Sequence, residues 1–456
     1  MRIAIDMQGA QGAGRFRGIG RYTLALAEAL LRNNTNHEII LVLNGLFPES
    51  LNWLKQHFQG KLPHENMLVW TAPGPVDYIS GSRNTWRRQV AEIIRERFLC
   101  SLNPDIVLVS SMIEGIGDNC VTSIRPFNNT FKVVAVVYDF IYQIYPDIYL
   151  ANPHVRNWYN EKFVHLKKAD LFLSISESSR QEAIQYGQIA ENKTINISTA
   201  ADQKFTRHTP EPSIVSELLA RIGISKPFVF YCGGSDARKN LPRLISAYAG
   251  LPKNLRDSHQ LLLVGTIPQH DIAALNEHGA KAGLSPTDMI IAGYMNDDAI
   301  ISLYGACKCF VLPSWHEGFG LPALEAMSCG APVIGSNSSS IPEVIGYPDA
   351  LFDPYNEKSI SKKIAQVLSD EKFRNKLIQH GSAQCKKFSW DLTAQRALAA
   401  LETLVVNGEK TSSASPDPVG SLIEEISKLP TRPTDQNDLL NLAAAIDFSF
   451  PEPPLP

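Results

Sequence analysis

Apolar residues occur along the chain in short runs bounded by turn residues, a pattern that predicts strands buried on both faces of a sheet. The runs are Arg2–Met7, Glu38–Asn44, Met67–Thr71, Asp105–Ser110, Lys132–Phe140, Leu171–Ser176, Thr194–Thr199, Phe228–Cys232, Gln260–Gly265, Met289–Gly293, Cys309–Leu312 and Val333–Gly335. Helical spacing separates several of them, as at Arg21–Leu31, Arg87–Leu102 and Ser178–Tyr186. Alternating strands and helices predict an α/β protein with parallel, doubly wound sheets.

The alternation is interrupted near the middle of the chain and stops before the C-terminus. Phe205–Lys226 contains Pro210 and Pro212 and leads into the second set of strands, so we expect domains at 1–205 and 206–406. The remaining residues, 407–456, have the composition of a polar linker followed by short amphipathic segments. This tail docks on the body, binds a partner protein or leads into a further domain, and the sequence leaves these possibilities open.

Composition places the chain among ordinary globular proteins, with 456 residues, a formal net charge of −3 and 44% hydrophobic residues. Nucleic-acid-binding proteins usually have a basic excess, which this chain lacks. The N-terminal stretch lacks the apolar core of a signal peptide, and no run approaches the roughly 18 apolar residues that cross a bilayer. Seven scattered cysteines without a C-x-x-C pair favour a reducing compartment. We therefore expect a cytoplasmic protein whose membrane contact is peripheral at most.

The stretch 313–344 carries the most chemical information. A loop holds Glu317, and Pro322 suits the first turn of a short helix that carries Glu325. A further helix is expected after Ser338–Ser340, whose hydroxyls suit an N-cap. Helix N-termini at the carboxyl ends of parallel strands attract phosphate, and carboxylates accept hydrogen bonds from sugar hydroxyls. Taken alone, the two glutamates are more often a helix charge and a loop carboxylate.

A cationic pair follows the first strand of the second expected domain. The sequence GGSDARKN places Gly234 in a tight turn, and it places Arg238 and Lys239 just ahead of a helix that begins near Asn240. Fixed cations beside a helix N-terminus suit a leaving diphosphate. The alternative interpretation is a solvated basic turn.

Glycines also follow the first strand of the chain, in the loop GAQGAGRFRGIG that includes Gly18. Strand, glycine loop and helix in this order are typical of a phosphate site, although the spacing G-x-G-x-x-G is absent. We therefore expect the backbone near Gly18 to approach an anionic ligand, and the alternative is a mobile surface loop.

Asp139 lies at the end of another apolar strand, where open α/β sheets place their ligands. It is a candidate for orienting an acceptor hydroxyl, and a strand-end cap is the alternative. The tyrosines that follow it form either a wall for stacking sugars or part of the core, and we favour the core: Tyr142, Tyr145 and Tyr149.

The run HEGFGLPALEAMSCGAPVI resembles the signature of retaining family 4 glycosyltransferases, with glycines and prolines in register. The glycine loop, with RGIGRY, resembles a loop of bacterial polysaccharide enzymes of that family. The resemblance implies the GT-B fold, in which two Rossmann-like domains face a cleft and the last helix of the second domain crosses back onto the first. Position and resemblance together mark as catalytic candidates Glu317, Arg238, Lys239 and Asp139, and as donor-binding candidates Glu325, Gly234, Phe319, Gly320, Leu321, Gly18 and Tyr294.

The resemblance also implies roles for these residues. Glu325 would hold the ribose of a nucleotide sugar, and Glu317 would hold the hydroxyls of the donor sugar. Arg238 and Lys239 would stabilise the departing diphosphate. The family requires no metal and no D-x-D motif is placed for one, so we expect no cofactor. One position departs from the pattern, because Tyr138 stands where many relatives have a histidine linked to the reaction centre.

Among relatives, the motifs look most like those of bacterial mannosyltransferases that build O-antigen. The sequence therefore predicts transfer of mannose from GDP-mannose to a lipid-linked glycan, with UDP-hexoses as the alternative donors. A nicotinamide dehydrogenase should have an acidic residue at the end of the second strand, where this chain has Asn44 and Gly45. A non-catalytic module would bind the nucleotide sugar without consuming it.

Overall fold

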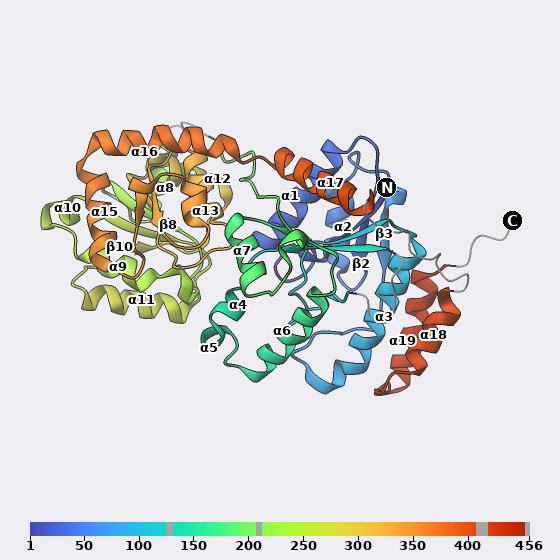
Figure 1. Cartoon of the computed structure of the whole chain (residues 1–456). Coiled ribbons are helices and arrows are strands. Elements are labelled where there is room, and N and C mark those ends of the chain that lie inside the picture. Colours follow the sequence, from blue (N-terminus) through green and yellow to red (C-terminus); the bar gives the residue numbers. More distant parts are fainter. Residues whose placement is uncertain (125–130, 207–211, 407–417, 452–456) are drawn as a thin grey trace. The chain divides into compact units, whose positions relative to one another are not determined.

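The computed structural model describes residues 1–124, 131–206, 212–406 and 418–451. The chain forms two compact units, each with a sheet of its own (Figure 1). Unit 1 comprises Met1–Ile175, Ser179–Ile197 and the C-terminal segment from Trp390, and unit 2 comprises Ser176–Ser178 and Ser198–Ser389. Of the expected linkers, Pro210 and residues 407–417 lie outside the described residues.

The sheet of unit 1 is parallel and has seven strands in the order β3-β2-β1-β4-β5-β6-β7. The strands are β1 (Arg2–Asp6), β2 (Glu38–Asn44), β3 (Met67–Trp70), β4 (Ile106–Val109), β5 (Lys132–Val137), β6 (Leu171–Ser174) and β7 (Thr194–Asn196). The sequence order runs outward in both directions from the neighbouring strands β1 and β4. This reversal is the topological switch point of unit 1.

The sheet of unit 2 is also parallel and has six strands in the order β10-β9-β8-β11-β12-β13. The strands are β8 (Phe228–Cys232), β9 (Gln260–Val264), β10 (Met289–Ile291), β11 (Cys309–Leu312), β12 (Val333–Ser336) and β13 (Leu351–Phe352). Here the switch point lies between β8 and β11. The predicted fold class, α/β with two doubly wound Rossmann-like domains, is confirmed.

Helices connect the strands of unit 1, and the C-terminal segment adds further helices. The α-helices are α1 (Gly18–Asn33), α2 (Pro48–His57), α3 (Thr85–Ser101), α4 (Ile141–Ile144), α5 (Pro146–Tyr149), α6 (Pro153–Leu166), α17 (Trp390–Val406), α18 (Pro418–Ser427) and α19 (Gln436–Ser449); α7 (Glu177–Gln185) begins at the boundary of the units. Helix α17 packs on α1, where Trp390 meets Tyr22 edge to face at 5.1 Å and Asp391 pairs with Arg32 at 2.6 Å.

Unit 2 has helices between its strands and a C-terminal pair that precedes α17. They are α8 (Pro212–Arg221), α9 (Leu241–Ala249), α10 (Lys253–Ser258), α11 (Gln269–Lys281), α12 (Asp297–Ala306), α13 (Leu321–Ser328), α14 (Ile341–Ile345), α15 (Glu357–Ser369) and α16 (Glu371–Gln384), with a 3-10 turn η5 (Ala237–Lys239) ahead of α9. Among the described residues, no helix is long and apolar enough to span a bilayer.

Each core lies where the continuous apolar strands are covered on both faces by helices. In unit 2, Phe230, Tyr304 and Phe310 pack ring to ring with centroids 5.3–5.8 Å apart, and all are fully buried. In unit 1, Arg95 and Asp6 form a buried ion pair at the end of β1. A buried charge pair holds position more than it adds stability, because both groups lose their hydration.

Several strands end earlier than expected, and one strand was missed. The apolar run that ends at Phe140 continues beyond its strand, since β5 stops at Val137 and Phe140 is buried in the following loop. Strand β13 was not predicted, because its two residues are too short to give a periodic signal.

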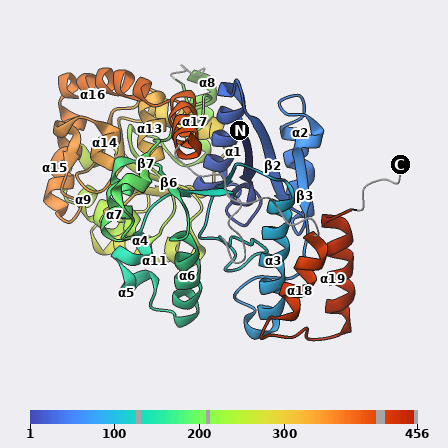
Figure 2. The same ribbon diagram turned by 45° about the vertical axis from the view of Figure 1, so that its right-hand side comes forward.

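The tail from Pro418 docks on unit 1, beside α3 (Figures 1 and 2). Leu422 and Ala445 belong to the apolar core, and the carboxylate of Asp438 is fully buried against Arg87 Nε at 2.6 Å. Helix α19 also contacts the edge strand β3, where Ser449 exchanges hydrogen bonds with the backbone of Thr71. Of the possibilities that the sequence left open, docking on the body is therefore observed.

Candidate active site

The switch point of unit 2 gathers the loops that carry most of the candidate residues. Strands β8, β11 and β12 are neighbours, and their carboxyl ends lead into the loops 233–240, 313–320 and 337–340. Parallel α/β sheets bind ligands at this edge, because the loops diverge there and leave room between them.

Glu317 is the centre of a compact charge cluster. Its Oε2 accepts a hydrogen bond from Arg238 Nη1 at 2.6 Å, and its Oε1 accepts from Lys239 Nζ at 2.6 Å. The hydroxyl of Ser314 also donates to Oε1 at 2.6 Å. Glu317 is only 6% exposed, so its charge is compensated by fixed neighbours rather than by water.

The cluster sets the protonation state of this carboxylate. Burial favours the neutral acid, but the positive charges of Lys239 and Arg238 outweigh it and lower the pKa of Glu317 to about 2. Burial lowers the pKa of the Lys239 ammonium, and the Glu317 charge opposes that shift. At neutral pH Glu317 is therefore a carboxylate held between two cationic side chains.

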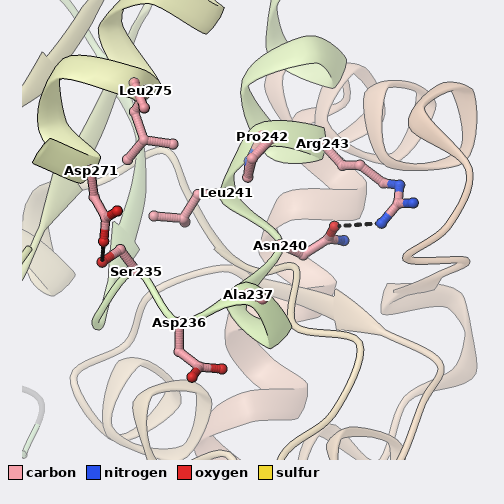
Figure 3. A pocket seen from close by; sticks show the side chains of 10 residues that line it. Ser235, Asp236, Ala237, Asn240, Leu241, Pro242, Arg243, Asp271 and Leu275 are labelled. Atoms are coloured by element: carbon pink, nitrogen blue, oxygen red, sulfur yellow. Dashed lines mark hydrogen bonds between the residues drawn. The ribbon is translucent and has the colours of Figure 1, made fainter. Parts of the chain in front are cut away.

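Asn240 fixes the position of the cationic turn. It takes the left-handed conformation with φ 61°, and its amide donates to the carbonyls of Pro313 at 3.0 Å and Pro354 at 2.8 Å. Its Oδ1 accepts from Arg243 at 3.0 Å, the bond drawn in Figure 3. The residue after Lys239 is thus tied to the loops that follow β11 and β13.

The serines before α14 hold the Glu317 loop instead of capping the helix. Ser340 Oγ donates to Glu317 O at 2.8 Å, and Ser338 Oγ donates to Trp315 O at 2.8 Å. Ser339 Oγ accepts from Glu317 N at 2.9 Å. The expected N-cap was wrong, because α14 has no side-chain cap and the hydroxyls serve the neighbouring loop.

The glycines after β8 and β9 allow a close approach of two loops. A Cβ on Gly265, whose φ is 151°, would lie 1.8 Å from the carbonyl oxygen of Gly233, so that no other residue fits there. The next residue, Gly234, accepts a hydrogen bond at its carbonyl from the buried hydroxyl of Tyr231 at 2.8 Å. Gly234 thereby sets the turn that leads to Arg238.

The remaining donor-binding candidates of unit 2 lie in the following segments. Gly320 is left-handed with φ 100°, and no side chain caps the N-terminus of α13, where Pro322 has no N–H and the N–H of Ala323 donates to Gly320 O at 3.0 Å. Phe319 is buried against Phe388, and Leu321 opens the helix. Glu325 accepts from Tyr304 at 3.3 Å, and Tyr294 is 74% exposed after β10.

A pocket of about 470 Å³ opens beside the cationic turn, between the start of α9 and α11 (Figure 3). Leu241, Pro242 and Leu275 line it with apolar groups, and Ser235 donates to Asp271 at 2.5 Å. Asp236 and Asp271 on its walls outnumber the one lining cation, Arg243, so we do not assign the donor diphosphate to it.

The other two candidates belong to unit 1. Asp139 follows β5, and its Oδ1 accepts from the N–H of Ile141 at 3.2 Å, as a strand-end cap would. Gly18 is the exposed first residue of α1, and a Cβ there would meet nothing within 4 Å. Close by on α1, Gly20 has no room for a side chain, because a Cβ there would lie 2.1 Å from Arg15 O.

One group in the described residues has the spacing of metal ligands. The ligand atoms of Glu114, Asp118 and Cys120 in unit 1 lie within 4.8 Å of one another. Asp118 accepts the N–H groups of Ala13 and Cys120, at 2.7 and 3.1 Å, which accounts for its position as a loop anchor. The expectation that no cofactor is needed stays a prediction.

Sequence reasoning missed the residues that position the cluster, which are Ser314, Asn240 and the hydroxyls of Ser338–Ser340. One local signal was present. Asparagine tolerates the left-handed conformation better than other non-glycine residues, and Asn240 follows the cationic pair directly. The serines gave no signal of their bonds, which depend on the meeting of β11 and β12.

Comparison with known proteins identifies the family. Residues 220–384, which include the charge cluster and Glu325, match the family model described as Glycosyl transferases group 1. The chain is also 34% identical over 448 residues to the serotype-specific mannosyltransferase WbdA of Escherichia coli. Residues 220–384 are therefore a group 1 glycosyltransferase domain. The alignment covers 98% of this chain and 53% of WbdA, so the chain spans about half the length of that relative.

Other glycosyltransferases support the same family and fold. O-antigen chain mannosyltransferase B of Escherichia coli is 35% identical over 260 residues, which are 56% of this chain and 66% of that protein. The structure of HepE from Anabaena with UDP and glucose has a TM-score of 0.64 and 19% identity, covering 88% of this chain and all of HepE. Sucrose-phosphate synthase from Thermosynechococcus elongatus has a TM-score of 0.66 and 18% identity, covering 90% of this chain and all of that one. The group 1 chain therefore has the predicted GT-B fold.

Proposed function

We propose that this chain transfers mannose from GDP-mannose to a lipid-linked glycan in O-antigen synthesis, at the cytoplasmic side of a membrane and with retention of the anomeric configuration. The observation that carries the proposal is the cluster at the switch point of unit 2, where Arg238 and Lys239 are both held by Glu317. The choice of mannose follows the names of WbdA and mannosyltransferase B, which are mannosyltransferases.

The cationic pair would act on the leaving group. Negative charge grows on the diphosphate as the sugar departs, and cations fixed beforehand stabilise that charge without reorganising. Arg238 and Lys239 supply such cations, so a metal ion is not part of the proposed mechanism. The backbone N–H groups of Gly320 and Leu321, which precede Pro322 of α13, would donate to phosphate or sugar oxygens.

The carboxylates would hold the hydroxyl groups of the donor. Glu325 would bind the ribose, and the exposed segment at Tyr294 would border the base. Glu317 would contact the donor sugar and also keep the cations in place, since the same carboxylate pairs with both of them. In unit 1, Asp139 would orient the acceptor hydroxyl, and the backbone at Gly18 would approach the donor.

Retention needs no covalent intermediate with the protein. An acceptor hydroxyl oxygen bonds to the anomeric carbon on the face from which the diphosphate leaves, and the carbon–oxygen bond to the diphosphate breaks. The proton of that hydroxyl passes to the departing diphosphate, which acts as the base. Atoms and charge balance without an oxidant or a metal.

A donor panel tests the proposal. The purified chain is incubated with a mannoside acceptor and GDP-mannose, UDP-glucose or UDP-galactose, and release of the nucleoside diphosphate is measured. We expect turnover with GDP-mannose to exceed that with either UDP-hexose by at least tenfold. Faster turnover with a UDP-hexose would show that the donor sugar is not mannose. Binding of every donor without consumption would indicate a non-catalytic module.

A further inference from the structure

Helix α16 runs along the outside of unit 2 and carries exposed lysines on its outer side (Figure 1). Lys372 and Lys376 are four residues apart, so they project about 40° from each other around the helix. The 3-10 turn η7 (Cys385–Lys387) continues from α16 and adds two more exposed lysines. Together these side chains form the α16 lysine face, which consists of Lys372, Lys376, Lys386 and Lys387.

The opposite side of α16 is packed against unit 2. Leu377 and Gly381 are buried, and a Cβ on Gly381 would lie 3.0 Å from Cγ of Met327 in α13. The side-chain amide of Gln384 donates to Glu343 O of α14 at 3.1 Å. The lysine face is therefore presented by a helix that is held against α13 and α14, and not by a loop.

The charge of this segment is unbalanced. Residues 371–388 contain five basic side chains and one acidic side chain, in a chain whose formal net charge is −3. Two other exposed lysines of unit 2 pair with acids four residues away, Lys253 with Asp257 at 2.5 Å and Lys281 with Glu277 at 2.6 Å. Among the described residues, no carboxylate forms an ion pair with the α16 lysine face.

Helix stability does not account for the first two lysines of the face. Lys372 lies in the first turn of α16, where the helix dipole favours acidic side chains. Lys372 and Lys376 are like charges at positions i and i+4, a spacing at which like charges destabilise a helix. Lys386 and Lys387 follow the C-terminus of α16 and suit its dipole. The first pair is therefore better explained by an anionic partner outside the chain.

The composition of the face favours a membrane surface over a protein or a nucleic acid. Among the described residues 371–388 no large apolar side chain is exposed, whereas the centres of protein interfaces are rich in aromatic residues and poor in lysine. Nucleic-acid sites use arginine and stacking aromatic side chains. The one arginine here, Arg374, is half-buried and donates to Val367 O at 3.0 Å. Clusters of about four or more basic side chains are typical of surfaces that bind anionic lipid headgroups.

We propose that the α16 lysine face binds the phosphate headgroups of an anionic membrane and holds unit 2 against it. The inference rests on the proposed function, whose acceptor is lipid-linked, and extends it by naming a surface of this chain that contacts the membrane. Each lysine near an anionic surface strengthens binding about fivefold. Because the attraction is electrostatic, it weakens as salt shortens the screening length from about 10 Å at 0.1 M to about 3 Å at 1 M.

Vesicle co-sedimentation tests the surface with a matched pair of variants. Lys372→Glu combined with Lys376→Glu reverses two charges of the face, and Lys253→Glu combined with Lys281→Glu makes the same change in net charge on α10 and α11. With vesicles containing about one third phosphatidylglycerol, we expect the α16 variant to bind at least tenfold more weakly than the wild type. The control variant should bind within twofold of the wild type. Raising NaCl from about 0.05 M to about 0.5 M should release the wild type.

A turnover assay separates the membrane surface from the active site. With GDP-mannose and a soluble mannoside, the variant with Lys372→Glu and Lys376→Glu should keep the kcat and the acceptor KM of the wild type within twofold. With a lipid-anchored mannoside in the same vesicles, its acceptor KM should rise at least tenfold. The control variant should match the wild type with both acceptors.

The proposal is refuted if the wild type does not bind phosphatidylglycerol vesicles at low salt, or if it binds pure phosphatidylcholine vesicles equally well. It is also refuted if the α16 variant melts like the wild type and keeps its affinity for the vesicles. Binding of single-stranded RNA or of an acidic protein through these lysines, without binding of vesicles, would assign the face to that partner and refute the membrane. Vesicle binding by a chain that consumes no donor would instead refute the proposed function and support the membrane surface.

Discussion

The side-chain amide of Asn240 donates a hydrogen bond to the carbonyl oxygen of Pro313 at 3.0 Å. This bond joins the residue after Lys239 to the residue before Ser314, and both of these neighbours donate to the same oxygen of Glu317. The loops that follow β8 and β11 are therefore fastened together directly behind the charge cluster. The side chain of Asn240 bonds to backbone carbonyls and to Arg243, and it acts by fixing where the charges of the cluster meet.

Substitution of Asn240 separates its conformation from its hydrogen bonds. Asn240→Gly keeps the left-handed backbone and loses the amide, whereas Asn240→Ala also strains the backbone by about 1 kcal/mol. We expect kcat with GDP-mannose to fall about tenfold in the glycine variant and further in the alanine variant, with a smaller change in donor KM. A glycine variant with the kcat of the wild type would show that the left-handed turn alone positions Lys239.

Loss of the Lys239 ammonium should affect turnover more than folding. Lys239→Ala removes one of the two cations proposed to act on the diphosphate, and removal of one such fixed group typically costs about 10²–10³ in rate. We expect a fall of that size in kcat, measured as release of GDP, with an unchanged circular dichroism spectrum. Lys253→Ala, which removes an exposed lysine of α10, is the control and should keep full activity. Equal turnover in the two variants would contradict the assigned role.

The stability of unit 2 should depend on pH through Glu317. Its pKa is lowered from 4.5 to about 2, so its contribution is fully present above about pH 4.5 and is lost as the pH falls toward 2. The shift corresponds to about 3 kcal/mol. We expect thermal melts to show a falling Tm across this window, and Glu317→Gln to have a lower Tm at neutral pH and a flatter profile.

Glu217→Gln provides the comparison for that profile, since Glu217 is an exposed carboxylate on α8 of the same unit. Its melts should follow those of the wild type at every pH. If Glu317→Gln and the wild type lose stability in parallel from pH 4.5 to 2, then other carboxylates dominate acid unfolding.

The docked tail should contribute to the stability of unit 1. Asp438→Ala leaves Arg87 and the hydroxyl of Thr434 without their buried partner, a change that typically costs about 3 kcal/mol. Asp447→Ala, on the exposed face of α19, is the control, because it also removes a carboxylate but should leave the free energy of unfolding nearly unchanged. The midpoint of urea unfolding should be lower for Asp438→Ala than for Asp447→Ala. Helix α19 of Asp438→Ala should also become sensitive to protease at a lower urea concentration. Equal midpoints would mean that the ion pair is not needed for docking.

The sequence predicted the sheets well because short continuous apolar runs in a chain of this composition usually form buried strands. Glu38–Asn44, Phe228–Cys232 and Cys309–Leu312 are strands with the expected bounds. At one end that moved, after β5, burial continues past the hydrogen-bonded strand. Phe140 is as apolar and as buried as a strand residue, yet its backbone N–H donates to Glu182 instead of to a neighbouring strand.

The charged residues of the site were predictable from the sequence, but the residues that hold them in position were not. Arg238, Lys239 and Glu317 were expected to share a ligand, and the structure brings them into contact. The hydroxyl bonds of Ser338 and Ser340 join segments 23 residues apart, and a local pattern cannot encode such pairs. The serines were assigned to the nearest helix because N-capping is the commonest local use of a hydroxyl before a helix.

The return of helix α17 onto α1 has a consequence for synthesis of the protein. Unit 1 is built from segments on both sides of unit 2, so the surface of α1 that receives Trp390 stays uncovered while unit 2 is being translated. Unit 1 can complete its packing only after α17 has been synthesised, whereas Ser198–Ser389 of unit 2 is synthesised as one continuous stretch. Unit 1 is therefore expected to complete its fold after unit 2, although its synthesis begins first.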